Sequence, residues 1–196
     1  MSVTKVLSGS KIAFLVANGC TEQDMTEAQR ALIEAGATTK IVSPDAGLVN
    51  GWAGDHWGHH YAVDVTLSTA LSADYDMLVV PGGQRALDKL MLTAHTKRFV
   101  NGFLVSDKPV VMFGDALHLL ITTDNVRGRT VAGPETMKDV VAQAGGTWSE
   151  STPVRDGVLI TGASDELTRK AMISEMVDFF GDHATMRRNM AAAVAA

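Results

Sequence analysis

Residues Lys108–Thr123 have the sequence KPVVMFGDALHLLITT, in which a short apolar segment passes through a Gly-Asp turn directly into a helical pattern. The segment Pro109–Phe113 has the length and the continuous apolar character of a strand buried on both faces. A helix is expected over Ala116–Thr122, so Gly114 and Asp115 lie at a sharp strand-to-helix turn. Together with the other Val- and Ile-rich runs of the chain, this unit predicts an α/β fold with a mostly parallel central sheet.

The alternation of strand and helix patterns continues along the chain. The predicted strands are Lys11–Asn18, Thr39–Val42, Tyr75–Val80, Pro109–Phe113, Thr130–Ala132 and Val158–Thr161, and the predicted helices are Thr21–Ala35, Thr93–Val105, Ala116–Thr122, Thr136–Ala144 and Glu166–Phe180. Gly36 is expected to end the first helix, because glycine readily takes the left-handed conformation that follows many helices. The stretch Ser43–Tyr61 has no helical period and is interpreted as an irregular excursion that holds at most a small hairpin.

Composition indicates an ordinary globular chain. Its 196 residues, 46% hydrophobic and 20% charged, are expected to form one domain over 11–182, with a lead-in over 1–10 and a tail over 183–196 that is a frayed helix or disordered. The net charge of −5 argues against a nucleic-acid partner, and the apolar runs are too short for a membrane span. The single cysteine, Cys20, excludes an internal disulfide and favours the reducing cytoplasm.

Three loops are candidates for a ligand site, because open parallel sheets bind ligands at the carboxyl ends of their strands. These loops begin at Gly19-Cys20, at Pro81-Gly82-Gly83 and at Gly114-Asp115. Around them the sequence carries, in order, the segments KIAFLVANG, ADYDMLVVPGG, SDKPVVMFGDALHLL, RGRTVAG and AGGTWSESTPVRDGVLITGAS. In their order and spacing these segments resemble the ThiJ/PfpI superfamily of intracellular protease-like, glyoxalase-like and stress proteins. The resemblance implies a flavodoxin-like, class I glutamine amidotransferase-like three-layer sandwich.

The resemblance also locates a missing nucleophile. In that superfamily the strand after Lys-Pro-Val enters a turn that carries a cysteine, usually followed by histidine. Counting from Lys108 places Gly114 at the cysteine position and Asp115 at the histidine position. The Gly-Asp-Ala turn is also similar to the non-catalytic C-terminal domain of large-subunit catalases. We therefore expect a degenerate elbow at Gly114, with Asp115 either capping the helix that follows or serving as an acid or base.

Other residues in or near these loops have two interpretations, one that the resemblance implies and one that follows from local structure alone. Asp24 matches the acidic residue that meets the family's thiolate, but Thr21 and Asp24 also fit a capping box. Gly82 and Gly83 match the backbone donors of an oxyanion hole, although a glycine pair also allows a sharp turn after a buried strand. Asp24 and the glycine pair, with Gly114 and Asp115, are expected to line a ligand site.

The remaining candidates are a thiol and several imidazoles. Cys20 is interpreted as a buried apolar side chain or as a displaced nucleophile, and His118 as a helix-packing residue or a partner of Asp115. The segment DHWGHH is rich in metal-capable side chains, but no fourth ligand is identifiable from the spacing and loops of this kind often form interfaces. Its weak metal candidates are His56, His59 and His60. No cofactor is expected.

Two functions follow from these patterns. The leading hypothesis is a non-hydrolytic small-molecule-binding, chaperone-like or stress-related protein, because the fold pattern is intact and the nucleophile is missing. The alternative is a hydrolase, hydratase or glyoxalase-type enzyme that uses Asp24, Asp115, His118 or Cys20. A homodimer or larger assembly is expected, because the excursion holds tryptophans in a glycine-rich segment and the family commonly pairs through this region.

Overall fold

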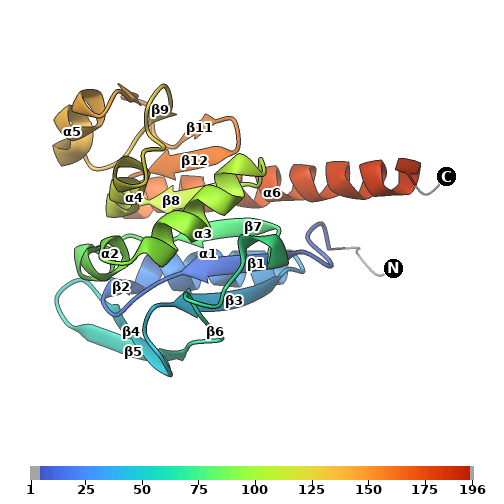
Figure 1. Ribbon diagram of the computed structural model, residues 1–196, viewed down its shortest axis with the longest axis horizontal. Helices are drawn as coiled ribbons and strands as arrows, with labels where there is room; N and C mark the ends of the chain where they lie inside the picture. The colour runs from blue at the N-terminus through green and yellow to red at the C-terminus, as the bar shows by residue number, and fades with distance from the viewer. Residues whose placement is uncertain (1–4, 195–196) are drawn as a thin grey trace.

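The structure, a computed structural model, describes residues 5–194, and its centre is a seven-stranded sheet with the strand order β11-β12-β8-β7-β1-β3-β6 (Figure 1). The strands are β1 (Lys11–Leu15), β3 (Thr38–Ser43), β6 (Val65–Thr66), β7 (Met77–Val80), β8 (Val110–Phe113), β11 (Val154–Asp156) and β12 (Leu159–Gly162). Neighbouring strands are parallel except β11, which is antiparallel to β12. The predicted α/β fold with a mostly parallel sheet is confirmed.

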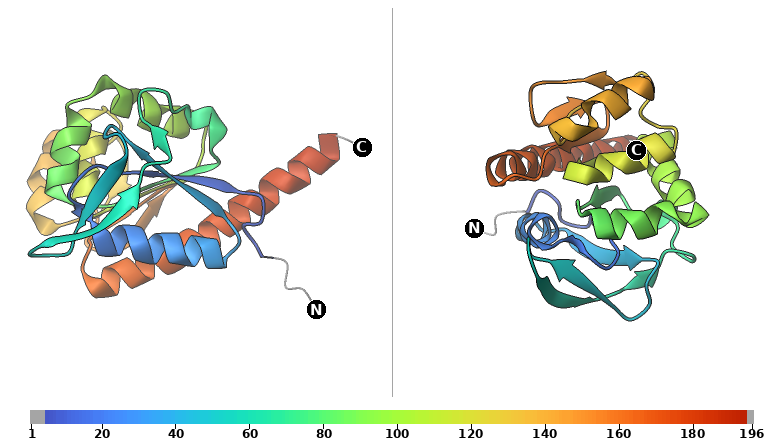
Figure 2. Two further views of the ribbon diagram at one scale, coloured as in Figure 1. Left: turned by 90° about the horizontal axis from the view of Figure 1, so that it is seen from below. Right: turned by 90° about the vertical axis from the view of Figure 1, so that its left-hand side faces the viewer.

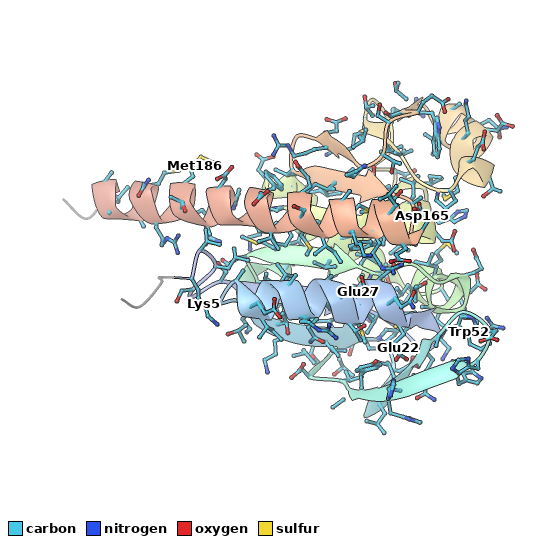
Figure 3. The ribbon with its side chains drawn as sticks, turned by 180° about the vertical axis from the view of Figure 1, so that it is seen from behind. Lys5, Glu22, Glu27, Trp52, Asp165 and Met186 are labelled. Carbon is cyan, nitrogen blue, oxygen red and sulfur yellow. The ribbon has the colours of Figure 1, made fainter. Side chains whose placement is uncertain are left out.

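Helices cover both faces of this sheet. α1 (Glu22–Glu34) and α6 (Glu166–Val194) lie side by side across one face, which Figure 3 shows from behind. α2 (Gln84–Met91), α3 (Ala94–Val105) and α4 (Leu117–Thr122) lie on the other face (Figure 1). The right-hand view of Figure 2 shows the sheet between these two helical layers, which is the expected three-layer arrangement.

The core follows from the apolar strands that the sequence predicted. Every residue of β7 and β8 is buried, as expected for strands covered by helices on both faces. Phe99 and Phe103 of α3 pack edge to face with their ring centroids 5.2 Å apart, and Phe113 closes β8 with no exposed surface. Each fully buried side chain of this kind contributes about 1.5 to 3 kcal/mol. The core therefore fixes the ends of the central strands.

The excursion after β3 forms a second, smaller sheet. β2 (Cys20–Thr21), β4 (Leu48–Trp52) and β5 (Trp57–Ala62) make three strands, of which β4 and β5 are an antiparallel hairpin. The small hairpin of the sequence prediction is thus confirmed. Trp52 packs edge to face on Trp57 with 5.3 Å between ring centroids, and the Arg85 guanidinium lies 3.8 Å from the centre of the Trp52 ring.

Several elements differ from the prediction. α2 and β11 were missed, and the closing helix continues beyond Phe180 to Val194. Residues 183–194 are therefore helical, whereas 195–196 lie outside the described residues. The remaining short elements are η1 (Ser72–Asp74), η2 (Gly114–Ala116), β9 (Thr130–Val131), η3 (Glu135–Met137), α5 (Lys138–Gln143) and β10 (Thr147–Trp148). Within 5–194, no helix is long and apolar enough to cross a membrane.

The lead-in is also tied to the domain. Leu7 has no exposed surface, and its backbone N–H donates to the Ala35 carbonyl at 2.9 Å. Gly36 follows with φ +100, so it ends α1 in the left-handed conformation that the sequence predicted. Residues 1–4 of the predicted lead-in lie outside the described part of the chain.

Candidate functional site

Four loops meet at one edge of the central sheet. β12, β8, β7 and β1 are consecutive neighbours, so the segments that follow their carboxyl ends lie together, where open α/β sheets bind ligands. These segments carry Ser164, Gly114, Gly82 and, in the first turn of α1, Asp24, and the place where the four segments meet is called the crevice. The sequence predicted the last three of these residues and missed Ser164.

Gly114 forms the strand-to-helix turn that the sequence predicted. It follows β8 directly, and the chain continues at once into η2 and then α4. Its φ of +52 lies in the left-handed region, which glycine adopts without the cost that a side chain would bring. A Cβ placed on Gly114 would also overlap with Ser164 Oγ. Both the backbone and its surroundings therefore suit glycine at this position.

Asp24 is the buried acid of the crevice. Its Oδ2 accepts hydrogen bonds from the Gly82 N–H at 3.1 Å and from the Ser164 hydroxyl at 2.9 Å. Its Oδ1 is buried and has no hydrogen-bond partner among residues 5–194. Burial raises the pKa of Asp24 to about 6, and the bonds from Ser164 and Gly82 oppose this rise by stabilising the carboxylate.

The capping-box interpretation of Asp24 is wrong. The Thr21 side chain makes no capping hydrogen bond, and the Thr21 N–H donates to the Gly82 carbonyl at 2.8 Å. Donors from distant loops thus replace the local ones that a capping box would need. Asp24 instead bonds to the loops of Gly82 and Ser164, which supports its interpretation as part of the ligand site.

A buried ion pair holds the loop that carries Ser164. Arg169, 5% exposed, donates to both carboxylate oxygens of Glu27 at 3.1 Å and to the Ser164 carbonyl at 3.0 Å. The pair joins α6 to α1, and Figure 3 shows Glu27 on the α1 surface that faces α6. Neither Arg169 nor Glu27 was predicted as a site residue, because charged residues on amphipathic helices are usually solvated.

The glycine pair after β7 permits a close approach of two loops. Gly83 has φ +113, and a Cβ on it would lie 2.6 Å from the Gly19 carbonyl oxygen and 2.8 Å from the Thr21 nitrogen. Gly82 uses its N–H for Asp24 and its carbonyl for Thr21. The sharp-turn interpretation of the pair therefore has direct structural support.

Cys20 lies in β2 beside this turn and is 1% exposed. Burial raises the pKa of its thiol to about 12, and the nearby carboxylates of Asp24 and Glu22 add to that rise. A thiolate is the reactive form of cysteine, so these surroundings oppose nucleophilic chemistry at Cys20. Of its two interpretations, the buried apolar side chain fits the geometry.

Asp115 and His118 do not form a pair. Asp115 lies in the first turn of η2, where no side-chain capping bond is present. No hydrogen bond or ion pair joins it to His118 anywhere in the described chain. Both residues are half-buried. The capping role of Asp115 is therefore not supported.

The histidine-rich segment pairs with carboxylates and gathers no metal site. His59 Nδ1 lies 2.6 Å from Glu22 Oε1, and His56 Nδ1 lies 2.6 Å from Asp55 Oδ1. His59 and His60 are neighbours on β5, so their side chains point to opposite faces of the hairpin. In the part of the chain that the structure covers, no three His, Cys, Asp or Glu side chains are placed to hold a metal ion.

An open cleft of about 650 Å³ lies next to the crevice, between α2 and the hairpin. Its lining residues are Asn18, Leu48, Asn50, Trp57, Arg85, Asp88 and Lys89. Leu48 and Trp57 are 53% and 52% exposed there. The cleft therefore has an apolar wall on the hairpin and charged groups on α2.

Comparison with known proteins identifies the family. The sequence matches the DJ-1/PfpI family over residues 10–177, which includes all four loops of the crevice. The chain belongs to the DJ-1/PfpI family. This membership confirms the resemblance to the ThiJ/PfpI superfamily, while the similarity to catalase C-terminal domains stays a prediction.

Among relatives in this family, protein DJ-1 homolog D of Arabidopsis thaliana is 35% identical over 111 residues, which are 55% of this chain and 28% of that protein. The chain thus spans less than a third of the Arabidopsis protein. A deglycase of Pyrococcus horikoshii is 28% identical over 147 residues, covering 75% of this chain and 86% of the deglycase.

Solved structures of the DJ-1/PfpI family share the fold. DJ-1beta of Drosophila melanogaster superposes with a TM-score of 0.78 at 17% identity, over 92% of this chain and 95% of that one. A two-domain protein of Anabaena variabilis with DJ-1/ThiJ/PfpI-like and ferritin-like domains gives 0.80 at 23% identity, over 87% of this chain and 50% of that one. At these identities the likeness concerns the fold alone.

Proposed function

We propose that this DJ-1/PfpI protein binds a small molecule at the crevice and performs no cysteine-based hydrolysis. The observation that carries the proposal is Gly114, which places a glycine on the strand-to-helix turn between the loops of Gly82 and Ser164. Asp24, Gly82, Gly83, Gly114 and Asp115 are the proposed lining residues. A chaperone-like or stress-related role in the cytoplasm is part of the same proposal, consistent with the single unpaired cysteine.

The state of Cys20 supports the absence of thiol chemistry. Its thiol is buried, and burial raises its pKa to about 12, so almost no thiolate is present near neutral pH. The relatives include a deglycase and a putative cysteine protease of Bacillus subtilis. We propose that this chain lacks the thiol-dependent activity that such names describe.

Methylglyoxal turnover tests this directly. We expect the purified protein to consume methylglyoxal no faster than a heat-denatured sample, before and after treatment with iodoacetamide. Cys20→Ser is the matched control, since it removes the single thiol. Turnover that iodoacetamide and Cys20→Ser both abolish would show that Cys20 is a displaced nucleophile and would overturn the proposal.

A general acid/base enzyme is the second candidate, and one observation favours it. Burial raises the pKa of Asp24 to about 6, near the value at which a carboxyl both holds and releases a proton under neutral conditions. Asp115 follows Gly114 directly, and His118 lies in the first turn of α4, so both are further candidates for this chemistry. A panel of small aldehydes, amides and peptides, tested on the wild type and on Asp24→Asn, decides between the two candidates. Turnover that Asp24→Asn abolishes would establish the enzyme.

Self-association is proposed from the exposed hairpin. Leu48 and Trp57 are each about half exposed on one side of the 650 Å³ cleft, and large exposed apolar side chains of this kind are enriched at subunit contacts. A two-fold dimer is the commonest homo-oligomer. We expect the hairpin or α1 to contribute to a contact of more than about 1,000 Å² in total.

A further inference from the structure

Ser164 occupies the space that a side chain on residue 114 would need. It lies two residues beyond β12, and its Oγ overlaps with the position of a Cβ built on Gly114, while its own Cβ would be 3.2 Å away. Any residue larger than glycine at 114 would therefore force the Ser164 side chain to rotate. That rotation would break its 2.9 Å hydrogen bond to Asp24. The identities of residues 114 and 164 are thus sterically coupled.

The hydrogen bonds leave the Ser164 oxygen as an acceptor. Its proton is committed to Asp24 Oδ2, and no hydrogen bond from another residue of 5–194 reaches Ser164 Oγ. Asp24 Oδ1 is a second acceptor without a partner, buried beside it. Arg169 donates its hydrogen bonds to Glu27 and to the Ser164 carbonyl, so it gives none to Asp24 Oδ1. The pair of Ser164 and Asp24 therefore presents unsatisfied acceptors and no free donor.

We propose that Ser164 is the specificity-determining residue of the crevice and selects a ligand that carries a hydrogen-bond donor, such as an amide, an alcohol or an amine. Ser164 is half-buried, whereas Asp24 has no exposed surface, so Ser164 is the residue of the pair that remains accessible from outside. The ligand step rests on the proposed function, and the steric coupling stands without it. We assign the hydroxyl a contact role through its oxygen, which accepts no hydrogen bond from another residue of 5–194.

A double-mutant cycle tests the coupling. Gly114→Ala is made alone and together with Ser164→Gly, and Tm is measured for all four proteins of the cycle. We expect Gly114→Ala to lower Tm at least twice as much in the wild-type background as in the Ser164→Gly background, since only the steric overlap depends on residue 164. Gly128→Ala, at φ +74 with open space around its Cβ position, should lower Tm equally in both backgrounds. Equal effects of Gly114→Ala in the two backgrounds would overturn the coupling.

If neither protein that carries Gly114→Ala folds, the Ser164→Ala variant tests the hydrogen bond between Ser164 and Asp24 instead. Removing the hydroxyl takes away a hydrogen bond that favours the carboxylate, so the pKa of Asp24, followed by carboxyl carbon NMR, should rise. An unchanged pKa would show that the hydroxyl is not bound to Asp24 and would overturn the proposal.

Acetamide and acetone test the ligand class, because they have similar shapes and only acetamide has N–H donors. Amide NMR signals around Gly82 and Ser164 should respond to acetamide with at least about fivefold tighter binding than to acetone, and Ser164→Ala should abolish the preference. Equal binding of both probes by the wild type would overturn the donor selectivity. If neither probe shifts these signals, the proposed ligand site fails together with its selectivity, while the cycle still judges the coupling.

Discussion

Replacing Asp24 by asparagine isolates the cost of an ionised carboxyl in the core. The Asn carbonyl oxygen can accept the two hydrogen bonds from Gly82 and Ser164, so the change mainly removes the titration. The pKa of Asp24 rises from 3.8 to about 6 on folding because the group is buried. At about 1.4 kcal/mol per pKa unit, ionising it in the folded protein costs about 3 kcal/mol more than in the unfolded chain.

The sign of the pH dependence follows from this rise. The folded protein binds the Asp24 proton more tightly than the unfolded chain, so this stabilisation is complete below the unfolded pKa of 3.8 and is lost as the pH passes about 6. Between about pH 4.5 and 7.5, wild-type stability should fall by about 2 kcal/mol relative to Asp24→Asn. Other titrating groups cancel in the difference between the two proteins.

Urea unfolding of both proteins across this pH range measures the difference. We expect Asp24→Asn to gain on the wild type as the pH rises and to level off above about pH 7. A difference that is constant with pH would show that Asp24 titrates alike in both states. A difference of the opposite slope would show that its pKa is lowered on folding, and either result would refute the account of this site.

Three further outcomes are expected. Arg169→Met should lower the free energy of unfolding by about 2 to 3 kcal/mol, which is less than the loss of a fully buried pair would cost, because Glu27 is 33% exposed. The control Lys170→Met removes an exposed pair and should change the free energy of unfolding in urea little. Gly83→Ala should lower the free energy of unfolding by more than the about 1 to 3 kcal/mol of positive-φ strain alone. Gly47→Ala, which also has a positive φ but has open space around its Cβ position, should cost only that strain, and equal losses in thermal unfolding would disprove the close approach at Gly83. Light scattering at micromolar concentration should give a mass of at least twice the 20.8 kDa of one chain. The double variant Leu48→Ser, Trp57→Ser should have a lower mass than the wild type, and a monodisperse wild-type monomer would refute self-association.

The strands were predictable because the sheet is covered on both faces, which demands continuous apolar runs. β7 and β8 are such runs, and both were found within two residues of their observed starts. α2 has only eight residues and directly follows the Pro-Gly-Gly turn, so its apolar residues span too few helical turns to be distinguished from the loop before them. β11 is a three-residue antiparallel edge strand with a mixed burial pattern, which gives too little periodicity to recognise.

The site was harder to predict because its bonds come from tertiary contacts. Thr21 and Asp24 match a capping box in sequence, yet Gly82 and Ser164 supply the donors that Asp24 uses. Ser164 had a usable signal, since the predicted strand Val158–Thr161 also ends at the ligand edge of a parallel sheet. Arg169 had none, because a buried and a solvated arginine look the same in a helical pattern.

The hydrogen bond between Asp24 and Ser164 joins residues 140 positions apart, and the pair of Glu27 and Arg169 spans 142. Contacts of such separation close long loops, at an entropy cost that grows slowly with loop length. During synthesis β1 and α1 emerge well before β12. The Ser164 hydroxyl, which is the second donor to Asp24, therefore becomes available only after most strands of the sheet have been made. Asp24 therefore gains its full set of hydrogen bonds only once the loop after β12 is in place, so the site is complete only when almost the whole chain has been made.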